Sequence, residues 1–112
     1  MNSIDFRREL HRHPELSFEE HRTQRFILDA LRVEGIECRK IATTGVLAKI
    51  EGERGNLSRC VVLRADIDAL PIEEQNDVEY RSENQGVMHA CGHDMHAAVL
   101  FGVLQEFARN RD

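Results

Sequence analysis

The chain lacks the features that would place it in several large protein classes. Its 112 residues include no run of the roughly 20 apolar residues that a membrane-spanning helix needs. The first ten residues lack the apolar core of a secretory signal peptide. The formal net charge is −5, so Lys and Arg are fewer than Asp and Glu. Non-specific nucleic-acid binding needs a surplus of Lys and Arg, and the charge therefore argues against it. The length fits one domain, with no membrane and no nucleic-acid partner expected.

Cysteine is also scarce. Cys38, Cys60 and Cys91 are an odd number at irregular spacing, which argues against a disulfide framework. The default expectation is therefore a reducing, cytoplasmic compartment. Cys38 and Cys60 lie beside apolar residues and are expected to be buried thiols, whereas Cys91 lies among histidines.

The first third of the chain has helical signals. Ser3 is a candidate cap for a helix to about Arg12, which Pro14 follows. The stretch "SFEE" at 17–20 has the pattern of a capping box for a second helix, and Gly35 is its expected end. The basic run "RRELHRH" at 7–13 is most simply a solvated helix face, with a phosphate-binding patch as the alternative.

The pattern then changes to that of strands. Alternation in "TGVLAKIEG" predicts a half-exposed strand, and the apolar start of "CVVLRADI" predicts a strand covered on both faces. A short strand is expected near Val78–Tyr80, within a polar connection. Helical spacing returns from His96 to Arg109. The order helix, helix, strand, strand, loop, helix indicates an α/β layered fold.

A dense group of metal-binding residue types precedes that last helix, in "MHACGHDMHAA" at 88–98. Cys91 and His93 are two residues apart, so in an extended segment both side chains project to one side. Gly92 between them allows a tight bend. Asp94 is expected either to cap the helix or to hold a ligand imidazole as an outer carboxylate.

One Cys-x-His pair is weak evidence alone, because a closed zinc site needs four ligands. No second Cys or His pair follows it, and the glutamate of an HExxH zinc helix is missing between His89 and His93. "RADIDALP" adds Asp66 and Asp68 at the end of the predicted buried strand, where sites gather in open α/β sheets. These carboxylates either face a cation or cap a turn, and the spacing leaves both interpretations open.

Four stretches together resemble a known family. They are "RRELHRHPELSFEEHRT", "TGVLAKIEG", "VVLRADIDALPIEE" and "GVMHACGHDMHAA", and they span nearly the whole chain. They are similar to the metal-dependent amidohydrolases of peptidase family M20, in the branch of hippurate hydrolases, N-acyl-amino-acid amidohydrolases, indole-acetyl-amino-acid hydrolases and N-acetyldiaminopimelate deacetylases. The resemblance implies that residues 1–112 are the N-terminal segment of a layered α/β/α, zinc-peptidase-like catalytic domain with a mostly parallel sheet.

The resemblance also implies site residues. Cys91 and His93 match ligands of a two-metal site, and Asp68 matches a carboxylate that supports the metal centre. The residues expected to line the site or support its ligands are Asp66, Asp94, His89 and His96. Asp66 stands where many relatives outside this branch carry a ligand histidine. The cofactor implied is a divalent metal, two per full-length site, with zinc, manganese, cobalt or nickel all compatible with the donors.

The implied reaction is cleavage of the amide bond of an N-acyl amino acid, or a small peptide-like substrate, by metal-activated water. In the family, the general-base glutamate belongs to a Glu-Glu pair after this motif; Glu73-Glu74 precedes the motif and is not that pair. This chain alone is therefore expected to be inactive. The rest of the catalytic domain, and a second domain for dimerisation and substrate capture, are expected outside it, in a homo-oligomer.

Two other interpretations remain at this stage. The first is a small metal-binding module with His89, Cys91, His93 and His96 as a complete site. The second is a non-catalytic remnant with no metal role, which would associate through an open sheet edge.

Overall fold

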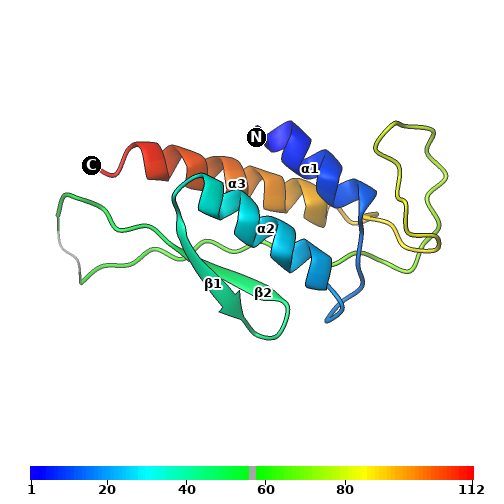
Figure 1. The fold of residues 1–112 in the computed structure, drawn as a ribbon, viewed down its shortest axis with the longest axis horizontal. Helices are drawn as coiled ribbons and strands as arrows, with labels where there is room; N and C mark the ends of the chain where they lie inside the picture. The colour runs from blue at the N-terminus through cyan, green and yellow to red at the C-terminus, as the bar shows by residue number, and fades with distance from the viewer. Residues whose placement is uncertain (56–57) are drawn as a thin grey trace.

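The computed structural model describes residues 1–55 and 58–112. The chain forms α1 (Ser3–Arg12), α2 (His21–Val33), β1 (Glu37–Ile41), β2 (Gly45–Lys49) and α3 (His93–Arg109). Figure 1 shows the three helices side by side, with the β1–β2 hairpin beneath α2. The order of elements confirms the α/β class, and α3 begins three residues earlier than its apolar spacing predicted.

Both predicted N-terminal caps are wrong in detail. Asn2, not Ser3, caps α1, because its side chain accepts from the backbone N–H of Asp5 at 2.8 Å. The Ser17–Glu20 capping box does not form. Instead the Glu15 carboxylate accepts from the N–H groups of Thr23 (2.6 Å) and Arg22 (3.2 Å), which satisfies the free donors at the start of α2. The Ser17 hydroxyl is engaged elsewhere, with Asp68.

The end of α2 and the first predicted strand are confirmed. Gly35 has a φ of 72° and follows the helix, and the N–H of Ile36 returns to the carbonyl of Leu31. β2 pairs antiparallel with β1, with Cys38 opposite Ala48. This hairpin is the single sheet among the described residues, so the mostly parallel sheet that the resemblance implies is not formed within them.

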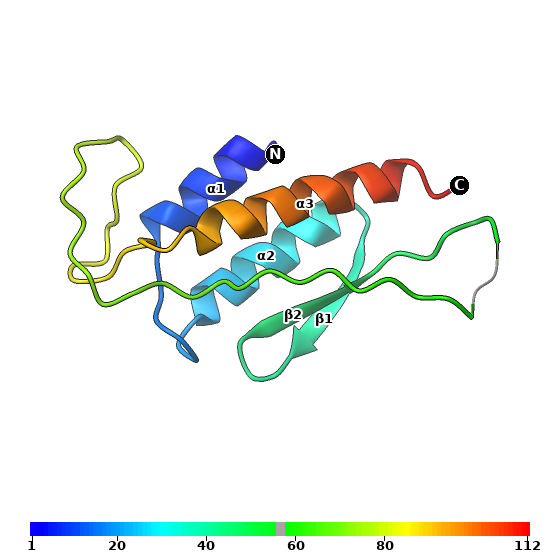
Figure 2. The same ribbon diagram turned by 180° about the vertical axis from the view of Figure 1, so that it is seen from behind.

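The second predicted strand behaves differently. Segment 60–68 forms no strand, and Val61 and Val62 are 85% and 83% exposed. The prediction of a strand covered on both faces is therefore wrong for this chain, because the described residues supply no neighbouring strand and no cover there. In Figure 2, which views the molecule from behind, this segment runs across α2 on the side nearer the viewer. Cys60 is exposed rather than buried, whereas Cys38 is half-buried. The strand expected near Val78–Tyr80 is also absent, because this stretch is a turn.

The apolar core lies where α1 and α2 meet α3. Phe6 of α1 stacks on Phe101 of α3 with ring centroids 4.2 Å apart, and Phe26 of α2 tilts against Phe6 at 5.1 Å. Leu10 and Leu31 complete the fully buried centre of this cluster. These residues lie on the helix faces that their i, i+4 spacing indicates.

A buried charged network ties α1 to α3 and to the loop between β2 and α3. His11 Nδ1 lies 2.8 Å from Asp94 Oδ2, and His11 Nε2 lies 2.8 Å from Glu74 Oε2. Arg7 Nε donates to the same Asp94 oxygen at 2.7 Å. The basic run at 7–13 is thus only partly solvated, since two of its members face these buried carboxylates. Both carboxylates are almost fully buried, so each needs such a partner.

The network shifts the pKa of each of its three titratable groups. The hydrogen bond to Asp94 raises the pKa of His11, against burial, and the bond to Glu74 adds to the rise. Burial alone would raise the pKa values of Asp94 and Glu74. The hydrogen bonds from His11 outweigh this only together with the charge of Arg7 at Asp94 and the N–H groups of Ser82 and Asn76 at Glu74, and the sum holds both pKa values below their ordinary range. His11 is therefore an imidazolium that donates through both ring nitrogens.

We predict that Phe101→Ala lowers the free energy of unfolding by about 3–5 kcal/mol, because a large buried ring is removed from the centre of the core. Phe107→Ala, on the same helix but with a half-exposed ring, is the control and should cost less than about 1 kcal/mol. Urea unfolding of the two variants gives the comparison. Equal losses would contradict this placement of the core.

A second prediction concerns pH. Because folding raises the pKa of His11, its contribution to stability is complete below its unfolded pKa of about 6.5 and is lost as the pH rises through the raised folded value. Folding lowers the pKa values of Asp94 and Glu74, so both carboxylates stabilise the folded state above their unfolded pKa values, near pH 4. This stabilisation is lost as the pH falls further. His11→Gln should therefore remove the loss of stability that the parent shows as the pH rises above about 6.5. The same substitution should lower the free energy of unfolding by about 3–5 kcal/mol at pH 6, because a buried ion pair loses one partner.

Urea midpoints of the parent and His11→Gln at several pH values test this. His13→Gln is the matched control, since His13 pairs with Glu9 and Glu83 at the partly exposed end of α1. If the urea midpoints of the parent and of His11→Gln change with pH in the same way above pH 6.5, His11 is not the group that causes the loss of stability.

Candidate metal-ligand segment

The start of α3 presents the histidine that the motif singled out. Gly92 precedes the helix with a φ of 94°, a left-handed conformation that a side chain at this position would oppose. The backbone therefore turns sharply between Cys91 and His93. His93 is the first residue of α3, and its side chain is 22% exposed.

Asp68 holds the His93 ring by one nitrogen. His93 Nδ1 lies 2.8 Å from Asp68 Oδ1 and 3.1 Å from the Asp68 carbonyl oxygen. With Nδ1 donating to these acceptors, Nε2 carries the lone pair, which is the state of a histidine that binds a metal. Asp66 Oδ2 lies 4.0 Å from that Nε2. The ring is thus oriented with its free nitrogen toward a second carboxylate.

Asp68 is itself held in place. Its second oxygen accepts from the Ser17 hydroxyl at 2.6 Å. That hydrogen bond is the main cause that lowers the pKa of Asp68; burial opposes it, and the bond with His93 adds to the lowering. The segment before α2 and the segment before α3 are therefore joined through one ionised carboxylate.

The other residues of the motif lie in different surroundings. Cys91 is a free, exposed thiol, and the His96 side chain is exposed with its ring centroid 6.1 Å from that of His93. His89 is only 4% exposed, and neither ring nitrogen has a hydrogen-bond partner. Burial lowers the pKa of His89 to about 4, so its ring is neutral. Asp94 contacts His11 and Arg7, so its carboxylate orients no ring of the motif.

The described residues do not form a complete metal site. Within 1–55 and 58–112, no three His, Cys, Asp or Glu side chains gather so that they could hold an ion. The four-residue site of His89, Cys91, His93 and His96 is therefore not formed, and that interpretation is wrong. The donors present do fit part of a site, since Cys91 Sγ and His93 Nε2 are the thiolate and imidazole types that zinc, cobalt and nickel accept.

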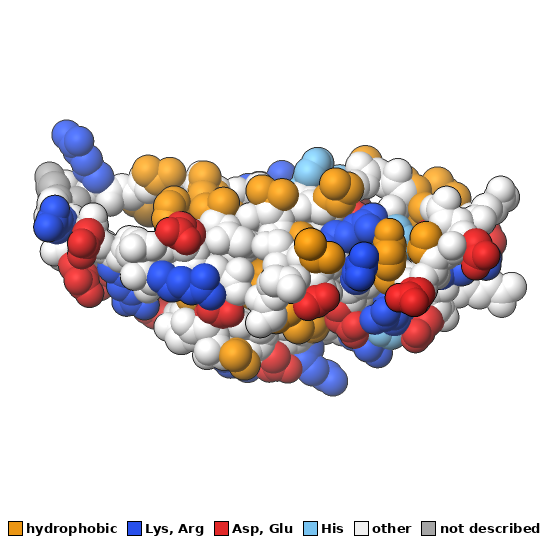
Figure 3. All heavy atoms as spheres, turned by 90° about the horizontal axis from the view of Figure 1, so that it is seen from above, with side chains coloured by type: hydrophobic (Ala, Val, Ile, Leu, Met, Phe, Trp, Pro, Cys, Tyr) orange, Lys and Arg blue, Asp and Glu red, His pale blue; other side chains and the backbone are white. Residues whose placement is uncertain are grey.

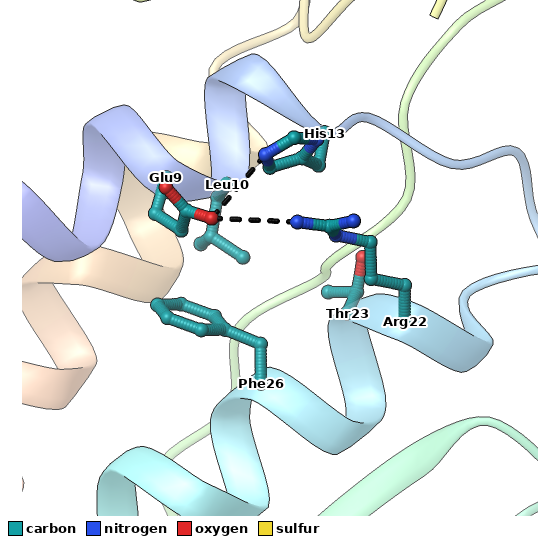
Figure 4. A pocket seen from close by; sticks show the side chains of 6 residues that line it. All are labelled: Glu9, Leu10, His13, Arg22, Thr23 and Phe26. Atoms are coloured by element: carbon teal, nitrogen blue, oxygen red, sulfur yellow. Dashed lines mark ion pairs between the residues drawn. The ribbon is translucent and has the colours of Figure 1, made fainter. Parts of the chain in front are cut away.

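One small hollow lies away from this segment, between α1 and α2. Its volume is about 40 Å³, near that of a single water molecule. In Figure 4, Glu9 lies between His13 and Arg22, with its Oε1 at 3.3 Å from His13 Nε2 and 3.6 Å from Arg22 Nη2. This is a partly exposed ion-pair cluster that joins two helices, and it is too small for a substrate.

Sequence analysis missed the residues that support the motif. His11 and Glu74 had no recognisable spacing relative to Asp94, because they are 83 and 63 residues away from the groups they bond. The position of Glu74 before the motif excludes it as the catalytic glutamate, and nothing in the sequence indicates its role as a buried partner of His11. The short polar side chain of Ser17 was assigned to a cap, although it contacts Asp68. Only tertiary structure brings these partners together.

Comparison with known sequences points to one family. The family model described as peptidase family M20/M25/M40 matches residues 62–112. An N-acyl-L-amino acid amidohydrolase of Geobacillus stearothermophilus is 47% identical over 110 residues, which is 97% of this chain and 29% of that protein. An N-acetyl-L-cysteine deacetylase of Bacillus subtilis is 49% identical over 97% of this chain and 26% of its own length. The chain thus spans less than a third of the length of these relatives.

Solved structures agree with the sequence comparison. A Bacillus subtilis protein, YXEP, described as a dinuclear metal-binding peptidase from the M20 family, superposes with a TM-score of 0.91 at 43% identity. The match covers 97% of this chain and 31% of that protein. A putative aminohydrolase from methicillin-resistant Staphylococcus aureus gives the same TM-score at 37% identity. In both sequence and fold, this chain matches the N-terminal portion of longer proteins of peptidase family M20.

Proposed function

We propose that this chain supplies two metal ligands, Cys91 and His93, to an M20-type amidohydrolase that cleaves the amide bond of N-acyl amino acids. The observation that carries the proposal is the Asp68–His93 pair beside Cys91. One ring nitrogen of His93 is engaged by Asp68 at 2.8 Å, which leaves the other nitrogen for a metal. The relatives named as N-acyl-amino-acid amidohydrolase and deacetylase support the reaction class.

The chain's own residues have distinct parts in this proposal. Asp68 orients His93, and Ser17 keeps Asp68 ionised and in place. Asp66 lies at the open side of the His93 ring, whereas His96 and the buried His89 border the same segment. Asp94 positions the start of α3 through α1 rather than through the metal. The chemistry that a pair of divalent ions supplies at such a site is polarisation of the amide carbonyl and activation of water.

The finer assignments extend this proposal. We propose zinc, cobalt or nickel as the metal for this thiolate–imidazole donor pair, with manganese as the candidate for a site of mixed donors. Residues 1–112 would form the N-terminal segment of the catalytic domain, within a cytoplasmic homo-oligomer whose substrate is an N-acyl amino acid or a small peptide-like amide. No helix among the described residues is long and apolar enough to cross a membrane. Two donors do not make a catalytic centre, so the isolated chain should not hydrolyse amides.

A chimera tests the proposed function. Residues 1–112 replace the matched region of the Geobacillus amidohydrolase, and hydrolysis of N-acetyl amino acids is assayed with added zinc or manganese. The chimera should be active, and Cys91→Ala and His93→Ala should each reduce activity to background, because each loses a ligand. Cys60→Ala is the matched control and should retain activity, since that exposed thiol lies outside the motif. An active Cys91→Ala chimera would contradict the ligand assignment.

A separate prediction concerns Asp68. Asp68→Asn in the chimera should weaken metal affinity by about 10–100-fold, because the ring of His93 loses the carboxylate that orients it. Ser17→Ala, which leaves the Asp68–His93 bond intact, should weaken it less. Metal affinity is measured by competition with a chromogenic chelator. Equal affinity in Asp68→Asn and the parent would show that Asp68 does not support this ligand.

The isolated chain offers a third test. Calorimetric titration of the purified 112 residues with zinc should show weak binding, because only two donors are available together. Cys91→Ala and His93→Ala should weaken it further. Tight one-to-one binding that both substitutions abolish would instead support a self-sufficient metal-binding module.

A further inference from the structure

A long loop connects the segment that carries Asp68 to the segment that carries Cys91. This loop, residues 71–87, contains no helix or strand. Leu70 and Met88 close its neck, because the N–H of each donates to the carbonyl of the other at 2.9 Å. Figure 1 shows the loop at the end of the molecule where α1 ends and α3 begins. Irregular loops of this length in a compact domain are usually either functional or disordered, and contacts with α1 hold this one in place.

The basic side chains of α1 form the surface on which the loop docks. The ring of Tyr80 lies beside the guanidinium groups of Arg7 and Arg8, which are 5.1 and 5.0 Å from its centroid. The N–H of Glu83 donates to the carbonyl of Arg12 at 2.8 Å. Figure 3 shows acidic, basic and hydrophobic side chains interleaved at the right-hand end of the face seen from above, where the loop lies against α1. The basic run is thus engaged by the loop.

Glu74 is the buried anchor of the loop and is only 2% exposed. One carboxylate oxygen accepts from His11 at 2.8 Å and from Asn76 at 3.1 Å, and the other accepts from the N–H of Ser82 at 2.6 Å. Among residues 1–55 and 58–112, His11 is the one cation within ion-pair distance of this carboxylate. Loss of that contact leaves a buried charge without a counter-ion, which favours release of the loop from α1.

His11 connects this anchor to the opposite end of the metal-ligand segment. Its Nε2 bonds to Glu74, in the loop that leads into the segment, and its Nδ1 bonds to Asp94, in the first turn of α3. Cys91 and His93 lie between these two points of attachment in the chain. The Cys91 thiol is exposed, so its place relative to His93 depends on how the two ends are held.

We infer that His11 is a positioning residue for the proposed metal ligands, Cys91 and His93. It sets their separation because it holds the start of α3 through Asp94 and the loop through Glu74. The inference rests on the proposed function, which assigns the two ligands. His11 acts through the two carboxylates rather than on the metal itself. Groups that orient ligands from outside strengthen metal binding, because the ligands lose less freedom when the metal arrives.

The protonation of His11 decides whether both ends are held. The titratable and charged groups that face its ring come from every element packed against it, and they are Arg7 of α1, Glu74 and Tyr80 of the loop, Asp94 of α3, and the neutral His89 before α3. An imidazolium donates to both carboxylates, whereas a neutral ring donates to only one. Asp94 keeps its bond from Arg7, so Glu74 is the partner that is lost as the pH rises.

Cobalt(II) titration of the chimera tests the inference. Thiolate-to-cobalt absorption reports binding at Cys91 and is read without any assay of activity. His11→Gln and Glu74→Gln should each weaken cobalt affinity about tenfold, because one or both ends of the segment are released. The difference between the parent and His11→Gln should shrink as the pH rises above about 6.5. Glu79→Gln is the matched control, since it removes the same charge from an exposed side chain of the loop, and it should bind as the parent does.

Two further variants separate positioning from stability and from the ligand assignment. Phe101→Ala weakens the core without touching the loop, so the folded chimera with this substitution should bind cobalt as the parent does. Cys91→Ala should abolish the thiolate-to-cobalt absorption, because the proposed ligand is removed. Glu74→Gln keeps the bond between His11 and Asp94, and it carries the comparison if His11→Gln does not fold.

Hydrogen exchange of the 112-residue chain gives a measurement that needs no metal. Mass spectrometry should show faster exchange of the amides of loop 71–87 in Glu74→Gln and His11→Gln than in the parent, because the loop is released from α1. The amides of α2 should exchange at the same rate in Glu74→Gln and the parent, since no residue of α2 bonds to the loop anchor.

The inference is overturned if His11→Gln and Glu74→Gln bind cobalt as tightly as the parent, or if Phe101→Ala weakens binding as much as they do. A loss in His11→Gln that is the same at every pH, or a loop that exchanges equally in all variants, would also overturn it. In each of these cases the proposed ligands still stand if Cys91→Ala abolishes the absorption. Retention of the absorption in Cys91→Ala would instead refute the ligand assignment, and with it the inference, so the two failures are distinguished.

Discussion

The structure depends on one buried imidazolium, His11. It lies between two carboxylates, Asp94 and Glu74, at 2.8 Å from each, and is the one cation that both buried acids contact. Arg7 supplies a second positive charge to Asp94, so the cluster of two acids and two bases is close to neutral. A single side chain of α1 therefore holds both the first turn of α3 and the loop that carries Glu74. The apolar stack of Phe6 on Phe101 fixes the same pair of helices further along, but it does not set where α3 begins.

This arrangement explains how the side chain of His93, at the start of α3, is held in one orientation by segments that lack regular secondary structure. Asp94 is held from one side by α1, and its neighbour His93 is held from the other side by Asp68. Asp68 is in turn bonded to Ser17, which precedes α2. The start of α3 is thus fixed by contacts from three separate segments, and the free nitrogen of His93 faces Asp66 at 4.0 Å. A metal ligand that is oriented before the metal arrives loses less freedom on binding.

The sequence alone predicted the helices, the second hairpin strand (β2) and the family, because these depend on local spacing or on contiguous motifs, whereas β1 was not predicted. Phe6 and Leu10 are four apart and lie in the core, and Gly35 ends α2 as its position indicated. The predictions that are wrong share a physical cause, which is that they depend on contacts with residues far away in the sequence. The Ser17 hydroxyl could either cap α2 or bond to Asp68, 51 residues away. It bonds to Asp68, because the tertiary fold brings the two side chains together. Val61 and Val62 have the composition of a central strand but not its environment, because composition cannot supply neighbouring strands. His11 looked like part of a solvated basic face, since nothing local indicates a buried acid 83 residues away.

The most direct test of this account is the protonation of His11 itself. Two-dimensional ¹H–¹⁵N NMR of the histidine rings in the 112-residue chain, recorded at about pH 6.5, near the unfolded pKa of histidine, reports whether each nitrogen carries a proton. Our account predicts that both Nδ1 and Nε2 of His11 are protonated, and that they stay so to higher pH than those of a histidine in the unfolded chain. Glu74→Gln should bring the titration of His11 to lower pH. A His11 ring with one unprotonated nitrogen at pH 6.5 would contradict the account, because the two buried carboxylates would then share no cation between them.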